Sequence, residues 1–254
     1  MTTSDKTAAF RTLHVPGRPL LMPNPWDVGS ARLLESMGFR ALATTSSGHA
    51  STLGLEDGAV DRRTALAHAA ALASAVDVPV SADLENGYAD DPSAVAETVA
   101  AAAAVGLAGC SIEDYDRERD RIYDIDVAAE RVASAAQAAR IADVVLTARA
   151  ENFIRHNPDL ADTIARLQAY QEAGAEVLYA PGLTDLTDIR SVVESVDRPV
   201  NVLTRPGLPP VHELAAAGVA RISVGGGLHA AALELVRRAA RELLDKGTYG
   251  WLGG

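Results

Sequence analysis

Cysteine and lysine are nearly absent from this chain of 254 residues, and each scarcity excludes a class of chemistry. Cys110 is the single cysteine, so the chain can form neither an internal disulfide nor a cysteine-based zinc cluster. The two lysines, Lys6 and Lys246, stand near the ends of the sequence. An enzyme that forms an imine needs a lysine at a strand end inside its site. Neither lysine is placed for that role.

Aromatic residues are also scarce, at 4% against 48% for hydrophobic residues as a whole. The core must therefore consist mostly of Ala, Val, Leu and Ile, which suits helices packed closely on a sheet. The formal net charge of −11 argues against nucleic acid or an anionic membrane surface as a partner. No apolar run reaches the roughly 18 residues of a membrane span, and the N-terminus leads into no apolar signal segment. We expect a cytoplasmic protein.

Short apolar runs alternate with longer, alanine-rich amphipathic segments along the whole chain. Eight runs are candidate strands: 20–22, 41–47, 78–83, 109–113, 144–149, 177–180, 200–203 and 222–224. The candidate helices are 28–37, 62–75, 94–105, 128–139, 162–173, 187–196, 211–217 and 228–244. Asp61 and Asp185 are typical N-caps, and Gly38 and Gly106 are typical residues at helix C-termini. Eight strand–helix units predict one α/β domain, a (β/α)₈ TIM-type barrel over residues 1–254. The rival doubly wound sheet lacks its Gly-x-Gly-x-x-Gly loop.

Acidic residues gather where two consecutive candidate strands end. Asp83 and Glu85 stand two residues apart before Gly87, and Glu113 ends the next strand. Side chains alternate along a strand, so Asp83 and Glu85 should share one face. A single acid at such a position could equally cap the following helix. Three carboxylates from neighbouring strands instead predict a site for Mg²⁺ or Mn²⁺ rather than zinc.

An arginine and a hydroxyl-rich run stand at other strand ends. Arg149 could clamp an anion with two hydrogen bonds, or pair with Glu151 as a structural bridge, and we favour the clamp. The run 44–48 offers hydroxyls and backbone N–H groups for a substrate carboxylate, although ordinary turn chemistry has the same composition. The glycines 225–227 suit a tight turn or a further anion site. The residues that we assign to substrate binding on these grounds are Thr45, Ser46, Ser47, Asp83, Arg149 and Asn201.

Five motifs of the sequence resemble the isocitrate lyase / phosphoenolpyruvate mutase superfamily, in the same order along the chain. They are Asn24-Pro25-Trp26-Asp27, Thr45-Ser46-Ser47-Gly48, Ser81-Ala82-Asp83-Leu84-Glu85-Asn86-Gly87-Tyr88, Ile112-Glu113-Asp114 and Ala148-Arg149-Ala150-Glu151. The resemblance implies a (β/α)₈ barrel whose Mg²⁺ is held, partly through water, by Asp83, Glu85 and Glu113. It also implies that Arg149 and the 45–47 loop bind an α-oxo or α-hydroxy carboxylate, and its first motif adds Trp26 to the substrate-binding residues. A homodimer or homotetramer that exchanges the last helix is a further implication.

The loop after Glu113 departs from every branch of that superfamily. The lyase branch carries a cysteine there, the mutase branch an asparagine and the hydrolase branch a threonine, and residues 115–123 contain none of them. Cys110 lies three residues before Glu113, on the opposite strand face, and cannot substitute. Isocitrate or methylisocitrate cleavage is therefore disfavoured. Tyr115 and Asp116 are the candidate catalytic acids of the loop, which is otherwise a charged lid.

Three functions remain as hypotheses. The first is a Mg²⁺-dependent lyase that cleaves or decarboxylates a small, oxaloacetate-like acid through a stabilised enolate. The second is a phosphonomutase or phosphonopyruvate hydrolase with a rewired loop. The third, from another class, is a barrel that binds a carboxylate or a metal without turnover.

Overall fold

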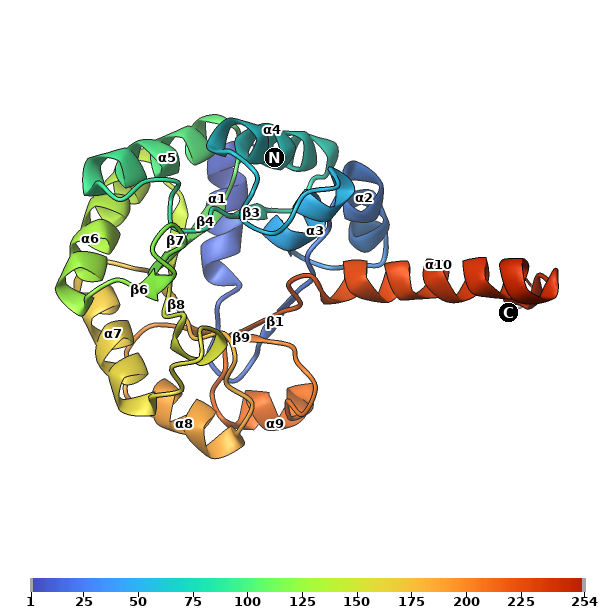
Figure 1. The fold of residues 1–254 in the computed structure, drawn as a ribbon. Coiled ribbons are helices and arrows are strands. Elements are labelled where there is room, and N and C mark those ends of the chain that lie inside the picture. The colour runs from blue at the N-terminus through green and yellow to red at the C-terminus, as the bar shows by residue number, and fades with distance from the viewer. Residues whose placement is uncertain (1, 253–254) are drawn as a thin grey trace.

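The structure, a computed structural model, describes residues 2–252 and is a barrel of eight parallel strands surrounded by helices (Figure 1). The strands are β1 (Leu20–Met22), β2 (Leu42–Ala43), β3 (Val80–Asp83), β4 (Gly109–Glu113), β7 (Val145–Arg149), β8 (Val177–Tyr179), β9 (Val200–Leu203) and β10 (Arg221–Ser223). Their spatial order is β1-β10-β9-β8-β7-β4-β3-β2. The remaining seam, between β1 and β2, is closed just beyond β1, where the Ala43 N–H donates to the Pro23 carbonyl (3.1 Å). The predicted (β/α)₈ fold is confirmed.

The outer helices follow the predicted segments closely. They are α2 (Val28–Ser36), α4 (Arg62–Ala75), α5 (Pro92–Ala104), α6 (Ile125–Ala142), α7 (Leu160–Glu172), α8 (Leu186–Glu194), α9 (Val211–Ala216) and α10 (Gly227–Lys246). Asp61 and Asp185 cap α4 and α8 by accepting backbone N–H bonds, as the sequence predicts. Gly38 and Gly106 have positive φ angles of 94° and 88°, which glycine adopts without strain. Local signals therefore set most element boundaries.

Four further features were not predicted from the sequence: α1 (Thr3–Thr12), α3 (Ser46–Thr52), a hairpin of β5 (Tyr115–Asp116) and β6 (Arg121–Ile122), and the short 3₁₀ turns Asn152–Ile154 and Gly250–Leu252. The predicted strand 41–47 was wrong in its second half, because the strand stops at Ala43. The hydroxyl of Thr45 accepts the N–H of Gly48 (3.2 Å) and so starts α3 instead.

Helix α1 closes the N-terminal end of the barrel and lies across the middle of the ring in Figure 1. Phe10 is fully buried among residues at the beginnings of the strands, including Leu20, Ala108 and Val145. A Cβ atom at Gly109 would lie 2.7 Å from the Phe10 ring, so glycine is what permits this approach. Helix α1 therefore covers the N-terminal end of the barrel, and we expect ligands to enter at the opposite, C-terminal end.

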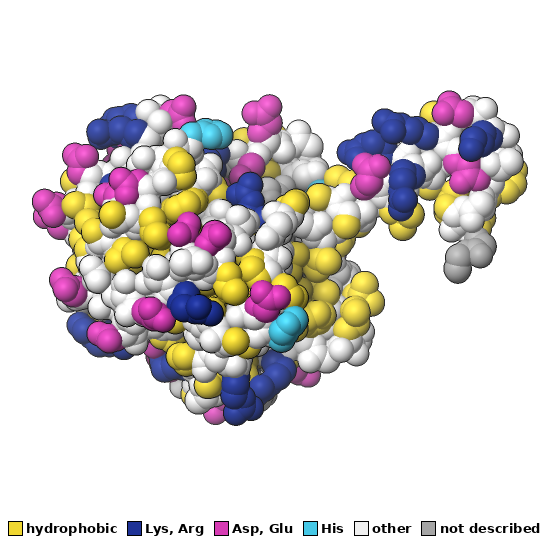
Figure 2. Space-filling view, turned by 90° about the horizontal axis from the view of Figure 1, so that it is seen from below, with side chains coloured by type: hydrophobic (Ala, Val, Ile, Leu, Met, Phe, Trp, Pro, Cys, Tyr) yellow, Lys and Arg dark blue, Asp and Glu magenta, His cyan; other side chains and the backbone are white. Residues whose placement is uncertain are grey.

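Helix α10 projects away from the barrel as a free arm (Figures 1 and 2). Its contact with the barrel is near its start, where the buried His229 packs edge-on against Trp26 at 5.2 Å between ring centroids. Beyond that point large apolar side chains are exposed, among them Val236 (62%) and Leu244 (84%). No helix among residues 2–252 combines the length and apolar character that crossing a membrane requires.

Candidate active site

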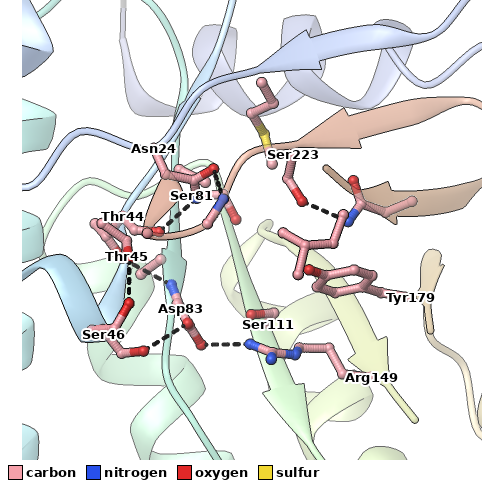
Figure 3. A pocket seen from close by; sticks show the side chains of 18 of the residues that line it. Asn24, Thr44, Thr45, Ser46, Ser81, Asp83, Ser111, Arg149, Tyr179 and Ser223 are labelled. Carbon is pink, nitrogen blue, oxygen red and sulfur yellow. Dashed lines mark hydrogen bonds and ion pairs between the residues drawn. The ribbon is translucent and has the colours of Figure 1, made fainter. Parts of the chain in front are cut away.

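A cavity of about 200 Å³ opens at the C-terminal ends of the strands (Figure 3). Among the residues predicted for substrate binding, its walls include Thr45, Ser46, Ser47, Asp83, Arg149 and Asn201. These side chains come from the start of α3 and from β3, β7 and β9, four parts of the chain that only the closed barrel brings together. The sequence therefore predicted much of this wall correctly.

The hydroxyl run holds Asp83 at the cavity from two sides. The Thr44 hydroxyl accepts the backbone N–H of Asp83 (2.9 Å), and the Ser46 hydroxyl donates to the Asp83 carboxylate (3.1 Å). Ser47 lies against the glycine turn, because a Cβ at Gly226 would stand 2.8 Å from its oxygen. The backbone N–H group of Gly225 is already bonded to the Asn24 side chain (2.8 Å). This turn is therefore tied to the end of the first strand, and the anion site predicted for it stays a prediction.

Arg149 is enclosed by three carboxylates. Its guanidinium lies 2.9 Å from Asp83, 2.8 Å from Glu151 and 3.3 Å from Glu113, and its side chain is 11% exposed. The structural bridge to Glu151 is therefore present, and Arg149 also faces the cavity (Figure 3). Its role as an anion clamp stays a prediction.

Glu85 does not share the strand face of Asp83, contrary to the sequence prediction. Strand β3 ends at Asp83, and Glu85 sits in a turn with φ +49°, a left-handed conformation to which the alternation of strand side chains does not apply. Its carboxylate lies 3.6 Å from the Arg117 guanidinium. Burial and then the charge of Asp83 raise the pKa of Glu85 to about 7. The two carboxylates therefore remain close enough to repel each other.

Glu113 is a buried carboxylate that contacts the Arg149 guanidinium. Burial, followed by the negative charge of Glu151, raises the pKa of Glu113 well above its usual range. A second arginine, Arg155, reaches it at 3.6 Å. Of the three carboxylates predicted to bind the metal, Asp83 lies on the cavity wall, whereas Glu85 and Glu113 do not.

The carboxylates fit a hard divalent cation that keeps part of its water. Within residues 2–252 no three histidine, cysteine or acidic side chains converge as direct ligands of one ion. Mg²⁺ usually retains several waters and is bound through one or two carboxylates. Asp83 at the cavity, with Glu85 and Glu113 behind it, offers oxygen donors of that kind. Burial is the main cause of the raised pKa values of the two glutamates, and the neighbouring carboxylates add to it a repulsion that a cation would relieve.

The two loop acids proposed from the sequence lie in the β5–β6 hairpin, and neither reaches the cavity wall. The Tyr115 hydroxyl donates to Asp120, and its ring is covered by Arg155 at 3.6 Å. Asp116 is 1% exposed and accepts from Arg119 (2.8 Å). Trp26 likewise packs on His229 and is absent from the cavity wall. The lid is thus a folded hairpin with its own ion pairs.

Several cavity residues were missed by the sequence analysis: Asp57, Tyr179, Arg221 and Ser223. Tyr179 ends β8, two residues before the Pro-Gly pair that marked that strand's end in the sequence. Arg221 begins β10, one residue before the predicted strand. From the sequence, an arginine at the start of a strand is expected on the surface. Asp57 lies in a connection with no repeating pattern. Tyr179 and Ser223 did carry a signal, because both lie near the C-terminal ends of predicted strands.

The family model for phosphoenolpyruvate phosphomutase matches residues 10–244 of the chain. A solved structure from Burkholderia cenocepacia J2315, described only as a lyase/mutase, is 50% identical, with a TM-score of 0.96 over 99% of this chain and 93% of that one. An uncharacterized protein of Mycobacterium tuberculosis H37Rv is 37% identical over 239 residues, 93% of this chain and 89% of that protein.

An oxaloacetate decarboxylase of Pseudomonas entomophila is 26% identical over 237 residues, covering 89% of this chain and 80% of that enzyme. Other matches are lyases and mutases as well. Both the sequence motifs and the barrel with its strand-end cavity agree with these matches. The chain belongs to the phosphoenolpyruvate mutase family, within the isocitrate lyase / phosphoenolpyruvate mutase superfamily of lyases and mutases.

Proposed function

We propose that this protein is a Mg²⁺-dependent lyase that cleaves or decarboxylates a small α-oxo or α-hydroxy carboxylate of the oxaloacetate type. The observation that supports the proposal most is the cavity wall on which Asp83, Arg149 and the hydroxyl run meet, with two further carboxylates behind them. Membership in a superfamily of lyases and mutases is consistent with it. Mn²⁺ would suit the same oxygen donors.

The carboxylates and hydroxyls of the site would bind the ion and the substrate, and Arg149 would stabilise the charge that develops in the reaction. Asp83, with Glu85 and Glu113 acting through water, would hold the ion, which when bound supplies a Lewis acid to the substrate's C2 oxygen. Thr45 and Ser47 would orient the C1 carboxylate through their hydroxyls, while Arg149 stabilises the developing enolate charge.

Tyr179 is the phenol on the cavity wall. Burial raises its pKa to about 12, so it stays protonated at neutral pH and can donate to the enolate.

Pyruvate release tests the proposal directly. The protein should release pyruvate from oxaloacetate or a malate-type acid in MgCl₂ and lose this activity in EDTA. Product from phosphonopyruvate alone would favour the mutase or hydrolase hypothesis instead. Metal-dependent oxalate binding in calorimetry without turnover of any of these acids would identify a binding barrel and contradict the lyase proposal.

We also propose that α10 makes this chain a homodimer or homotetramer, because its apolar side chains lack cover within residues 2–252. Light scattering should show an oligomer for the wild type and a monomer for the double variant Val236→Glu/Leu244→Glu. Arg241→Glu on the same helix is the matched control and should remain an oligomer. A monomeric wild type, or an unaffected double variant, would contradict the proposal.

A further inference from the structure

Arg221 is a buried cation on the floor of the cavity. It begins β10, is 3% exposed and lies on the cavity wall. The strand register pairs Arg149 with Tyr179, Tyr179 with Asn201, and Asn201 with Arg221. All four residues line the cavity. Arg149 is the last residue of its strand and Arg221 the first of its own, so this row descends from the mouth of the barrel to its floor.

All the hydrogen-bond partners of Arg221 are neutral. Its guanidinium donates to the Asn201 side-chain oxygen (2.9 Å), to the Thr147 hydroxyl (3.0 Å) and to Nε2 of His14 (3.0 Å). The other ring nitrogen of His14 lies 2.9 Å from the Phe10 carbonyl, which places the proton there and leaves Nε2 as an acceptor. Burial, and then the charge of Arg221, lowers the pKa of His14 to about 3, so this ring is uncharged at neutral pH.

The two arginines of the cavity therefore differ in charge balance. Arg149 lies within 3.3 Å of three carboxylates. Arg221 makes no ion pair with any carboxylate in the described part of the chain. Burial lowers its pKa only to about 10, so it remains a cation at neutral pH. An uncompensated buried charge costs several kcal/mol, and here the charge faces a cavity that a ligand can enter.

We propose that Arg221 forms a second anion subsite on the cavity floor, which binds the distal carboxylate of the substrate. This inference rests on the proposed function, because it assumes that an α-oxo or α-hydroxy acid occupies the upper part of the cavity. The first carboxylate and the C2 oxygen lie at the level of Asp83, Ser46 and Ser47. The second carboxylate reaches down to Arg221, beside the Ser223 hydroxyl. A cavity of about 200 Å³ is several times the roughly 30 Å³ that one water takes in the liquid, which leaves room for an acid of four carbons.

The competing explanation is that Arg221 is a structural strut that ties His14, and with it α1, to the barrel floor. The isosteric change Asn201→Asp separates the two roles. It keeps the oxygen that accepts from Arg221 and places a negative charge 2.9 Å from its Nε. If Arg221 is a strut, this counter-charge strengthens its bond to residue 201 and leaves ligand binding unaffected. If Arg221 is an anion subsite, the counter-charge neutralises the guanidinium and weakens anion binding.

Calorimetry with malate and 2-hydroxybutyrate in MgCl₂, each as both enantiomers, provides the test. The two acids share the carboxylate, hydroxyl and chain length, but malate ends in a carboxylate and 2-hydroxybutyrate in a methyl group. The wild type should bind one malate enantiomer at least tenfold more tightly than either 2-hydroxybutyrate. Arg221→Gln should lower the malate affinity at least tenfold and change the 2-hydroxybutyrate affinity less than twofold. Asn201→Asp should lower the malate affinity at least tenfold more than it lowers the 2-hydroxybutyrate affinity.

If the wild type binds malate and 2-hydroxybutyrate with equal affinity, the subsite proposal is wrong, and no variant is needed to show it. Equal losses for both acids in the variants, or no loss for malate, would also overturn it and leave the strut. If the wild type binds neither malate, 2-hydroxybutyrate nor oxalate, the proposed function is wrong, and the subsite proposal that rests on it is wrong as well. Binding of both acids with equal affinity, by contrast, leaves the proposed function standing.

Discussion

Replacing Asp83 by asparagine is expected to abolish Mg²⁺-dependent oxalate binding and to lower kcat/KM for the substrate by about a hundredfold or more. Asp83 is the predicted metal-binding carboxylate that lies on the cavity wall, held by Ser46 and by its own backbone bond to Thr44. Asparagine keeps the size and the hydrogen bond to Ser46 but removes the charge that binds a cation. Calorimetric titration of oxalate in MgCl₂ and in EDTA measures the effect.

The matched control is Asp61→Asn. Asp61 is the exposed N-cap of α4, where it accepts the backbone N–H of Thr64 (2.7 Å), and asparagine caps a helix about as well. This variant should bind oxalate like the wild type. If Asp83→Asn retains the wild-type Mg²⁺-dependent affinity, Asp83 does not hold the ion and the metal site must lie elsewhere.

The sequence was sufficient for the barrel because the signals for it are local. Helix caps such as Asp61 and helix-ending glycines such as Gly38 act within one turn, and the short apolar runs between them had to be strands. Arg149 and Asp83 could be placed at the cavity because the C-terminal ends of parallel strands always meet at one end of a barrel. These inferences needed no knowledge of side-chain contacts.

The failures came from turns and side-chain contacts that the strand and helix patterns do not describe. Alternation along a strand placed Glu85 beside Asp83, but the strand had already ended, and the turn before Gly87 sets the direction of the Glu85 side chain. The hairpin that removes Tyr115 from the cavity depends on pairing between Tyr115 and Ile122 and on a bond between Arg119 and Asp90, 29 residues away. The bond between Arg119 and Asp90 has no local signal in the sequence.

Arg221 illustrates the same limit for charge. Composition favours the surface for arginine, and the neighbours that receive its hydrogen bonds come from three other parts of the chain, Thr147, Asn201 and His14. Only the closed barrel shows that this cation is buried and lacks a counter-charge within the described residues. A charged residue that is buried without a counter-charge is therefore informative about the ligand that the cavity binds.

Removal of Arg149 is expected to destabilise the fold, in addition to any effect on catalysis. Arg149→Met leaves Asp83, Glu113 and Glu151 without their shared cation, and breaking a buried ion pair on one side typically costs about 3–5 kcal/mol. We expect the free energy of unfolding to fall by about that amount at pH 7.5. The measurement is guanidinium denaturation followed by circular dichroism.

The loss of unfolding free energy in Arg149→Met should become smaller as the pH falls. A loss caused only by poorer packing would not depend on pH in this way. The pKa of Glu113 is already raised in the fold, and without Arg149 it rises further, so the folded variant takes up a proton at a higher pH than its unfolded chain does. Protonation then favours the folded form, and the variant should recover part of its stability between pH 7.5 and pH 5. Arg62→Met is the control, because Arg62 and its partner Glu97 are 43% and 72% exposed, and this change should lower the free energy of unfolding by less than about 1 kcal/mol at either pH. An equal deficit at both pH values would mean that the charge of Arg149 does not stabilise this cluster.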